Sequence, residues 1–491
     1  MHRSRLALFA LIGLVVLSGC TLPGSSNHFD TDRELGSVGD YAHDDEFEFD
    51  AGDGLTESQL EAVKYRSMAR IEVVRGLKFE RDVDLEVISR AEYRDRRGGS
   101  EAASPFANEV WRGAFVVDGE TDVNRAMDDL YGGSVVGYYV NDRIVIVADD
   151  ADEIRIDRAT LVHELVHALQ DQHFGLARNG GTIDVRRAEL GLIEGEASYV
   201  PHLYDRRCGE AWQCLPDYER PAGEVAPGES FNVGLFLSIY APYAEGPTFV
   251  DALRERGDWA AVDRAHDERP ASTSQLLHPE RYPDDRPADV AISDRSSDDW
   301  EPIGPDGDPR TETVGEATLF ASLWANGAVD RSLLEGGTDL SPYNYSHPAT
   351  DGWAGDTIRV YRGDDGNRTG HVWTLAWQSD ADAAAFADAY RTVLANRGAT
   401  PVDDANASAD GVYRIADGRP FAGAYRLTVD GDAVTIVGAP TVAGLEAIHG
   451  SETPSSSLGR TPATTPTLPA SSPAPLSSSP APPAATTPAD G

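Results

Sequence analysis

The chain holds one five-residue pattern whose residue types can bind a metal ion and use it. His163 and His167 are four positions apart, and Glu164 directly follows the first histidine. On a helix this spacing points both imidazole rings to nearly the same side, close enough to share one ion. The carboxylate of Glu164 can then take a proton from a water molecule bound to that ion. The pattern therefore predicts a hydrolytic metal site with two ligands and a general base.

The residues around this pattern are those of an amphipathic helix. Apolar residues recur between positions 162 and 169 at the spacing of one helix face, and this stripe would pack against a core. Asp157 or Thr160 can cap the start of the helix, and Gly175 suits its end. The alternative is an amphipathic surface helix on which the two histidines hold no ion.

A catalytic zinc ion needs a third protein ligand and one open coordination position. Residues 189–200 predict a second helix that carries Glu194 and Glu196. These two carboxylates point to nearly opposite sides because they are two residues apart, so only one can face the histidines. The residues alone leave open which one it is, and both could instead lie on a solvated helix face.

Together these segments resemble a known class of enzymes. The His163–His167 pattern followed by Glu194-Gly195-Glu196-Ala197 is similar to the gluzincins, zincin metallopeptidases with a glutamate ligand. Residues 194–200 resemble the segment of zinc aminopeptidases whose leading glutamate is the third ligand. The resemblance implies a zincin-like fold and Glu194 as the ligand, with Glu196 as runner-up. It also implies Zn²⁺, although these ligands would accept cobalt or manganese.

The resemblance has limits that concern specificity. Residues 163–174, 193–197 and 272–282 resemble an uncharacterised family of haloarchaeal surface lipoproteins, over roughly residues 60–440. This second likeness implies a fold and a metal site but no substrate. The aminopeptidase Gly-x-Met-Glu-Asn pattern does not occur in the sequence. Aminopeptidase specificity therefore does not carry over.

Zincins also place a strand at the rim of the substrate cleft. Residues 134–147 predict a hairpin that turns at positions 141–142, directly before the metal-binding helix. By the resemblance, a peptide substrate would add to this hairpin as a further strand. An ordinary core hairpin is the alternative.

Peptide hydrolysis needs a donor that stabilises the oxyanion. Zincins take this donor from the C-terminal half, where the candidates are His278, which we rank first, Tyr282 and Tyr243. The alternative for His278 is a loop histidine that bonds to a backbone carbonyl group.

The N-terminus predicts export from the cell. Residues 1–20 have a basic start and a short apolar run, as in a signal peptide rather than a membrane-spanning helix. Residues 17–20 resemble the lipobox of prokaryotic lipoproteins, which implies cleavage before Cys20 and a lipid on its sulfur. The lipid would anchor the protein at the extracellular face of the cell membrane. Cys208 and Cys214 could form a disulfide in this oxidising exterior.

The charge balance is strongly acidic. The formal net charge is −40, from 82 acidic and 42 basic residues. In molar salt such charges are screened within a few Å, and a hydrated acidic surface stays soluble. The charge therefore indicates a halophilic protein and argues against nucleic acid as a partner. It carries no information about the substrate.

Composition and pattern predict an α+β protein. We expect a zincin-like domain, with a small mixed sheet and active-site helices, over residues 56–290. The other predicted segments are a signal peptide (1–20), an acidic flexible linker (21–55), a linker (291–310), a C-terminal α+β module or lobe (311–450) and a disordered Ser/Thr/Pro/Ala-rich tail (451–491). The elements predicted outside the metal site are helices at 57–75 and 380–395 and strands at 83–88, 110–117, 357–361, 371–377 and 425–437.

The primary expectation is a zinc-dependent metallopeptidase that acts on a peptide or protein substrate outside the cell. In it His163, His167 and Glu194 hold the ion, Glu164 moves the proton, and His278 or a tyrosine stabilises the oxyanion. The alternative is a catalytically inactive zincin-like surface protein that binds a partner. A lipoprotein that captures solutes for a transporter would need two similar lobes, and the sequence shows no such pair.

Overall fold

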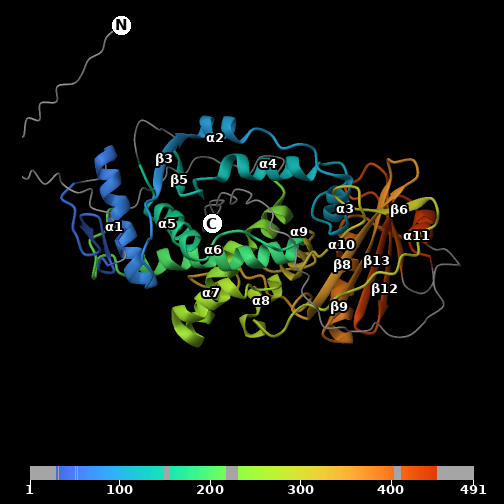
Figure 1. The fold of residues 1–491 in the computed structure, drawn as a ribbon. Coiled ribbons are helices and arrows are strands. Elements are labelled where there is room, and N and C mark those ends of the chain that lie inside the picture. The colour runs from blue at the N-terminus through green and yellow to red at the C-terminus, as the bar shows by residue number, and fades with distance from the viewer. Residues whose placement is uncertain are drawn as a thin grey trace, which may run out of the picture.

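The computed structural model describes residues 29–30, 32–49, 51, 54–148, 155–216, 231–402 and 411–450. Helices fill one part of the molecule and a large antiparallel sheet forms the opposite end (Figure 1). The predicted α+β class is confirmed. The predicted signal peptide with Cys20 and the predicted tail at 451–491 lie outside the described residues. Among the described helices, none combines the length and the apolar character that crossing a membrane requires.

A small mixed sheet lies next to the helix that carries His163 and His167. Its order is β3-β5-β4, with β3 parallel and β4 antiparallel to β5. The bounds are Asp84–Ser89 for β3, Gly137–Val140 for β4 and Arg143–Ala148 for β5. Asn141 and Asp142 have φ values of 48° and 61°, the left-handed conformation that a tight hairpin turn requires. The predicted hairpin is therefore confirmed.

Four long helices form the centre of the helical part. They are α1 (Glu57–Arg75), α5 (Arg158–His173), α6 (Ile183–Asp205) and α7 (Val233–Asp267). A Cβ atom on Gly195 of α6 would lie 2.4 Å from the backbone of Gly246 in α7. The glycines therefore let the two helices cross in direct backbone contact. The shorter helices are α2 (Arg90–Arg97), α4 (Val123–Ser134), α8 (Thr273–Leu277), the 3₁₀ helix η1 (Pro279–Arg281) and α9 (Glu316–Ala325).

The large sheet has the strand order β10-β11-β12-β13-β9-β8-β6, and β7 pairs with β8 beside β6. Its strands are β6 (Trp300–Ile303), β7 (Thr311–Glu312), β8 (Trp353–Gly363), β9 (Thr369–Trp377), β10 (Thr400–Pro401), β11 (Val412–Ile415), β12 (Gly423–Asp430) and β13 (Ala433–Ala439). The helices α3 (Pro105–Gly113), α10 (Asp380–Asn396) and α11 (Val442–Ile448) pack on it. The strands and the helix predicted between positions 357 and 437 are present.

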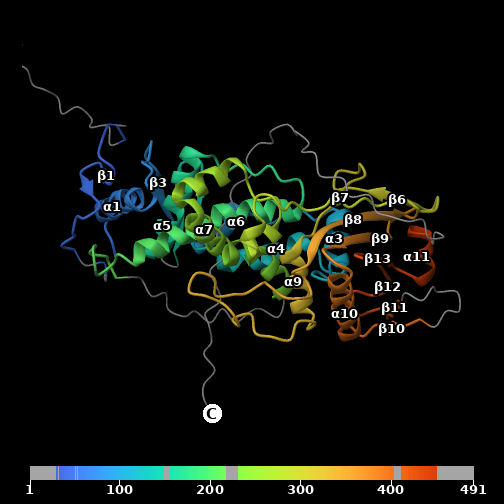
Figure 2. The ribbon, with the colours of Figure 1, turned by 90° about the horizontal axis from the view of Figure 1, so that it is seen from below.

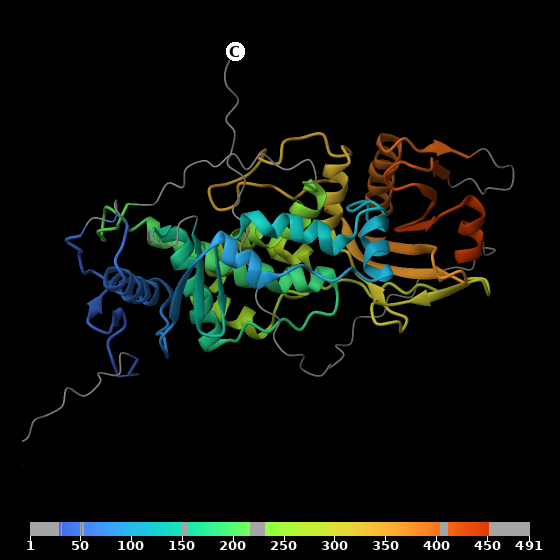
Figure 3. The same ribbon diagram turned by 90° about the horizontal axis from the view of Figure 1, so that it is seen from above.

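The largest hydrophobic cluster joins the large sheet to α7 and α9. It contains Phe115 after α3, Leu237 of α7, Phe320 of α9 and Trp373 of β9, all at most 1% exposed. The buried residues of α1, α5 and the small sheet form a separate cluster. The views from below and above show α5, α6 and α7 between α1 and the large sheet (Figures 2 and 3). The largest cluster packs residues 311–450 against the helical part.

Three sequence predictions are wrong. The first is the strand at 110–117. Residues 110–113 are instead the last turn of α3, because Ser104 caps its N-terminus and Pro105 occupies its first turn, and residues 114–117 form a turn after it. The predicted linker 291–310 contains β6, which pairs with β8 because Trp300 and Ile303 bury apolar surface.

The third wrong prediction is the flexible linker over residues 21–55. The described part of it contains β1 (Ser37–Val38) and β2 (Tyr41–Ala42) and packs on α1. Arg70 donates from Nε to the carbonyl oxygen of His43 at 2.7 Å. The guanidinium of Arg66 lies 3.7 Å from the centre of the Phe47 ring. Arginines of α1 thus hold a segment whose acidic composition suggested a free chain.

Candidate metal centre

The helix α5 carries the first two predicted ligands at one flank of a buried face. The Oδ2 atom of Asp157 accepts a hydrogen bond from the backbone N–H of Thr160 at 2.8 Å, which fixes the start of the helix. The apolar side chains between positions 161 and 169 are at most 1% exposed. This packing sets the rotation of α5, and with it the direction of both imidazole rings.

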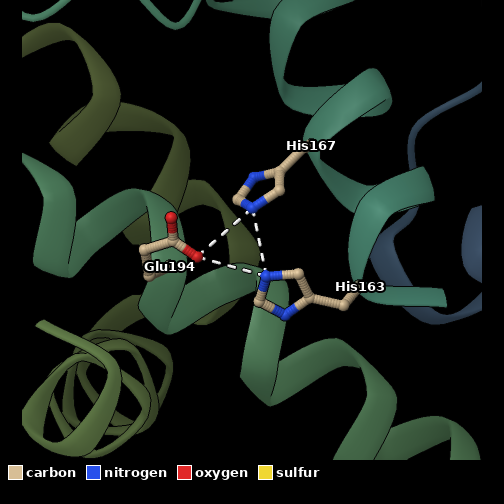
Figure 4. A group of neighbouring side chains, drawn as sticks. All are labelled: His163, His167 and Glu194. Carbon is tan, nitrogen blue, oxygen red and sulfur yellow. Dashed lines mark hydrogen bonds and ion pairs between the residues drawn. The ribbon is translucent and has the colours of Figure 1, made fainter. Parts of the chain in front are cut away.

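The three predicted ligands meet between α5 and α6 (Figure 4). The Oε2 atom of Glu194 lies 3.1 Å from Nε2 of His163 and 3.3 Å from Nε2 of His167. The two Nε2 atoms are 3.1 Å apart. One donor atom from each residue therefore faces a common point, and the group could hold a metal ion.

The electrostatics of this group favour ionised Glu194. Burial alone would raise the pKa of its carboxyl, but His167 and His163 outweigh burial and lower the pKa to about 2. Burial lowers the pKa of His167, but Glu194 and Glu164 overcome it and raise the pKa to about 9. The site thus places negative charge beside the buried imidazole of His167 and the part-buried imidazole of His163, and a divalent cation would balance the same charge.

Glu164 lies against the strand β4 next to the ligands. Its side chain is buried, and its Oε1 atom has no hydrogen-bond partner in the described part of the chain. A Cβ atom on Gly137 would lie 3.3 Å from that oxygen, so the glycine lets β4 approach the carboxyl closely. Burial raises the pKa of Glu164. A buried carboxyl with one unpartnered oxygen is suited to accept and return a proton.

Gln170 fixes the orientation of His167, a role that the sequence analysis did not assign. Its Nε2 atom donates to the carbonyl oxygen of Ile193 at 2.9 Å, which fixes the amide because a carbonyl can only accept. Its Oε1 atom therefore accepts from Nδ1 of His167 at 2.9 Å. The proton on Nδ1 leaves Nε2 with the lone pair that a metal ligand needs.

Glu196, the runner-up for the third ligand, faces a different set of partners. It forms a buried ion pair with Arg75, and its Oε2 atom lies 2.6 Å from Nε2 of His266. The same oxygen accepts from Gln170 at 2.9 Å. These contacts hold the pKa of Glu196 far below its usual range in spite of burial. The structure thus directs Glu194, and not Glu196, to the two histidines.

The candidates for the oxyanion donor are separated in space. His278, which ranked first, lies 2.8 Å from Oε1 of Glu316 through Nε2 and belongs to a second group with Asp351. That pairing turns it to Glu316, which is fully buried, and not to the three ligands. The hydroxyl of Tyr282 donates to the carbonyl oxygen of Glu268. Tyr243 does reach the site, since its hydroxyl donates to Oε1 of Glu194 at 3.1 Å.

The structure pairs Cys208 with Cys214 in a disulfide. The bond closes the turn that follows α6, and Nη1 of Arg70 in α1 lies 3.7 Å from the sulfur of Cys214. The C-terminal end of α6 is therefore tied down next to α1.

The comparisons with known proteins cover a different part of the chain. A family model described as a domain of unknown function (DUF8575) matches residues 301–449. This match spans the large sheet and leaves α5 and α6 outside it. No curated protein and no solved structure matches the chain.

Proposed function

We propose that this protein is a zinc metallopeptidase of the zincin kind, with His163, His167 and Glu194 as metal ligands. The observation that carries the proposal is the meeting of these three donors beside the unpartnered oxygen of Glu164. Two imidazoles and one carboxylate are the ligand set of zinc hydrolases such as thermolysin, with one coordination position left open. Bound there, the ion would act as a Lewis acid that polarises a carbonyl group and lowers the pKa of a water molecule.

Glu164 has the surroundings of a proton carrier. Its burial favours the neutral form, so a proton taken at Oε1 is held until a leaving amine can receive it. The hydroxyl of Tyr243 orients Glu194 through the oxygen that faces away from the histidines. Gln170 orients His167 in the same manner. Glu194 and His167 are thus each oriented by a hydrogen bond at the side-chain atom that does not face the other predicted ligands.

The strand β4 is the element that we expect to align a peptide. It occupies the edge of its sheet among the described strands, and it passes directly over Glu164 at Gly137. A substrate that pairs with this edge through main-chain hydrogen bonds would lie along the metal site. Such pairing depends on the main chain of the substrate and not on its side chains, so it suits a peptide or protein substrate.

The test compares wild type with Glu164→Gln in molar KCl. We expect both proteins to bind about one zinc ion per chain. Cleavage of a peptide library should fall by about 10²–10⁴-fold in the variant, because the amide cannot accept the proton. Glu280→Gln is the matched control, since the Glu280 side chain is 73% exposed.

Two results would refute the proposal or part of it. Equal cleavage by wild type and Glu164→Gln would remove Glu164 from the role. Zinc binding without cleavage of any peptide by wild type would favour the inactive surface-binding protein.

We also infer that the protein acts at the outer face of the cell membrane, anchored by a lipid on Cys20. The disulfide between Cys208 and Cys214 supports this location, because such bonds persist in oxidising surroundings. Cys20→Ser should shift the protein from the membrane fraction to the culture medium. A variant that stays with the membrane as wild type does would contradict the lipid anchor.

A further inference from the structure

Arg187 lies on α6 near the three predicted ligands and forms no ion pair with the described part of the chain. Its Nε atom is buried without a hydrogen-bond partner among the described residues, and the residue as a whole is part-buried. Its guanidinium lies 5.8 Å from the centre of the Trp111 ring. The neighbouring Arg186, in contrast, donates to the carbonyl oxygen of Gly181 and lies 3.8 Å from Glu312. In a chain of net charge −40, an arginine without a carboxylate partner needs an explanation.

The position of Arg187 relates it to the metal ligands. It precedes Glu194 on α6 by seven residues, which is about two helical turns, so both side chains leave the same side of the helix. Tyr131 of α4 lies within electrostatic reach of both residues. Along the helix axis the two residues are about 10 Å apart.

The energetics favour an anion beside Arg187. Burial of a cation without a bonded partner is costly, and it lowers the pKa of Arg187 to about 10. Tyr131, Tyr345 and Asp184 favour the charged form without bonding to it. The Asp184 carboxylate accepts from Thr273 instead. Tyr345 is fully buried and donates to the carbonyl oxygen of Leu237, so its hydroxyl does not serve as a counter-ion. A bound carboxylate would remove this cost, and a guanidinium can hold it with two parallel hydrogen bonds.

We propose that Arg187 binds a carboxylate of the substrate and so selects peptides that carry a negative charge near the cleaved bond. An extended peptide spans at most about 3.3–3.6 Å per residue, so the carboxylate would lie within about three residues of that bond. It would be either the free C-terminus or an aspartate or glutamate side chain. This inference rests on the proposed peptidase function, because Glu194 defines the point from which the distance is counted.

The experiment measures binding separately from cleavage. Three forms of one fluorescent peptide are titrated into zinc-loaded Glu164→Gln protein in molar KCl: a free C-terminus, a C-terminal amide, and the amide with one aspartate near its end. We expect about tenfold tighter binding of the free acid, of the aspartate form or of both, relative to the neutral amide. The form that gains affinity identifies the source of the carboxylate. Adding Arg187→Gln should abolish the gain, and Arg187→Lys should keep part of it because it retains the charge but not the two-pronged geometry.

Arg186→Gln is the matched control, because it removes the same charge from the adjacent position. The preference for a carboxylate should survive in it. Equal affinity for all three peptides in the Glu164→Gln protein, or an equal loss for all three on adding Arg187→Gln, would overturn the inference. If wild type cleaves no peptide but the Arg187-dependent preference is present, the peptidase proposal fails and the carboxylate site stands. If wild type cleaves all three forms with the same kcat/KM and binds them equally, the carboxylate site fails and the peptidase stands.

Discussion

Glu194 and Glu196 lie two residues apart on α6, and their surroundings differ in kind. Glu194 faces two imidazoles whose charge depends on what they bind. Glu196 faces Arg75, which always carries a charge, and His266. Both carboxylates are buried to the same degree, 1% exposed. Burial alone therefore does not distinguish a candidate metal ligand from a structural ion pair. The two glutamates are distinguished by whether their partners carry a fixed charge.

The two carboxylates are also linked. Gln170 contacts His167 through Oε1 and Glu196 through Nε2. The structural network around Glu196 therefore reaches Nδ1 of His167, a proposed metal ligand. If an ion binds there, this network would hold His167 in place without contacting the ion, as supporting hydrogen bonds do in zinc sites.

The largest expected effect comes from Glu194→Gln, which breaks the metal side of the comparison. The zinc content should fall from about one ion per chain to nearly none after dialysis, because a neutral amide is a poor ligand. Elemental analysis measures this directly. A chelator should lower the unfolding temperature of wild type and leave that of the variant unchanged, since only wild type has bound metal to lose. Full zinc content in Glu194→Gln would show that the carboxylate is not a ligand.

The second largest effect is expected from Glu196→Gln, which removes the buried ion pair between Glu196 and Arg75. It leaves Arg75 with Asp263, whose side chain is 39% exposed, as its remaining carboxylate. Removing one partner of a buried pair should lower the free energy of unfolding by about 3–5 kcal/mol. Thermal unfolding at fixed KCl measures the loss, and zinc content should persist in the folded protein.

The matched control for this prediction removes both charges. Arg75→Met combined with Glu196→Met should recover much of the lost stability, because no buried charge is then left alone. If Glu196→Gln released zinc without a change in stability, the roles of the two carboxylates would have to be exchanged.

The smallest expected effect tests Gln170, which connects His167 to Glu196. Gln170→Leu removes the acceptor for Nδ1 of His167, and zinc affinity should fall by about 10–100-fold. Competition with a zinc-binding dye measures the change. Gln172→Leu is the control on the same helix, since Gln172 contacts the backbone of Glu80 and Arg81 and no ligand. Equal affinities in the two variants would remove Gln170 from the site.

Much of the site could be predicted from local sequence. The helix α5 follows from its cap at Asp157 and its apolar stripe, and the hairpin follows from two turn residues at Asn141 and Asp142. Each of these features depends on residues a few positions apart. The two histidines could be named as donors for this reason, whereas Glu194 was chosen by resemblance.

The failures concern residues whose partners are distant in the sequence. His278 ranked first as oxyanion donor, but it pairs with Glu316, the first residue of α9. The acidic segment before α1 suggested a free chain, and arginines of α1 hold it instead. Gln170 is three residues from His167 on α5, but the carbonyl group that fixes its amide belongs to Ile193 on α6. Arg187 gave no local signal, because its proposed role comes from the lack of an ion pair with the described residues.

By itself the sequence determined that two imidazoles and Glu164 lie together, because a four-residue spacing on one helix is fixed by local geometry. It did not determine which carboxylate joins them. The rotation of α6 decides that, and packing sets this rotation where Gly195 meets the backbone of Gly246 in α7. Gly195 separates the two glutamates, so the close contact of α6 with α7 aims one at the histidines and the other at Arg75. Only the tertiary structure contains that contact, since it joins helices that the sequence specifies one at a time.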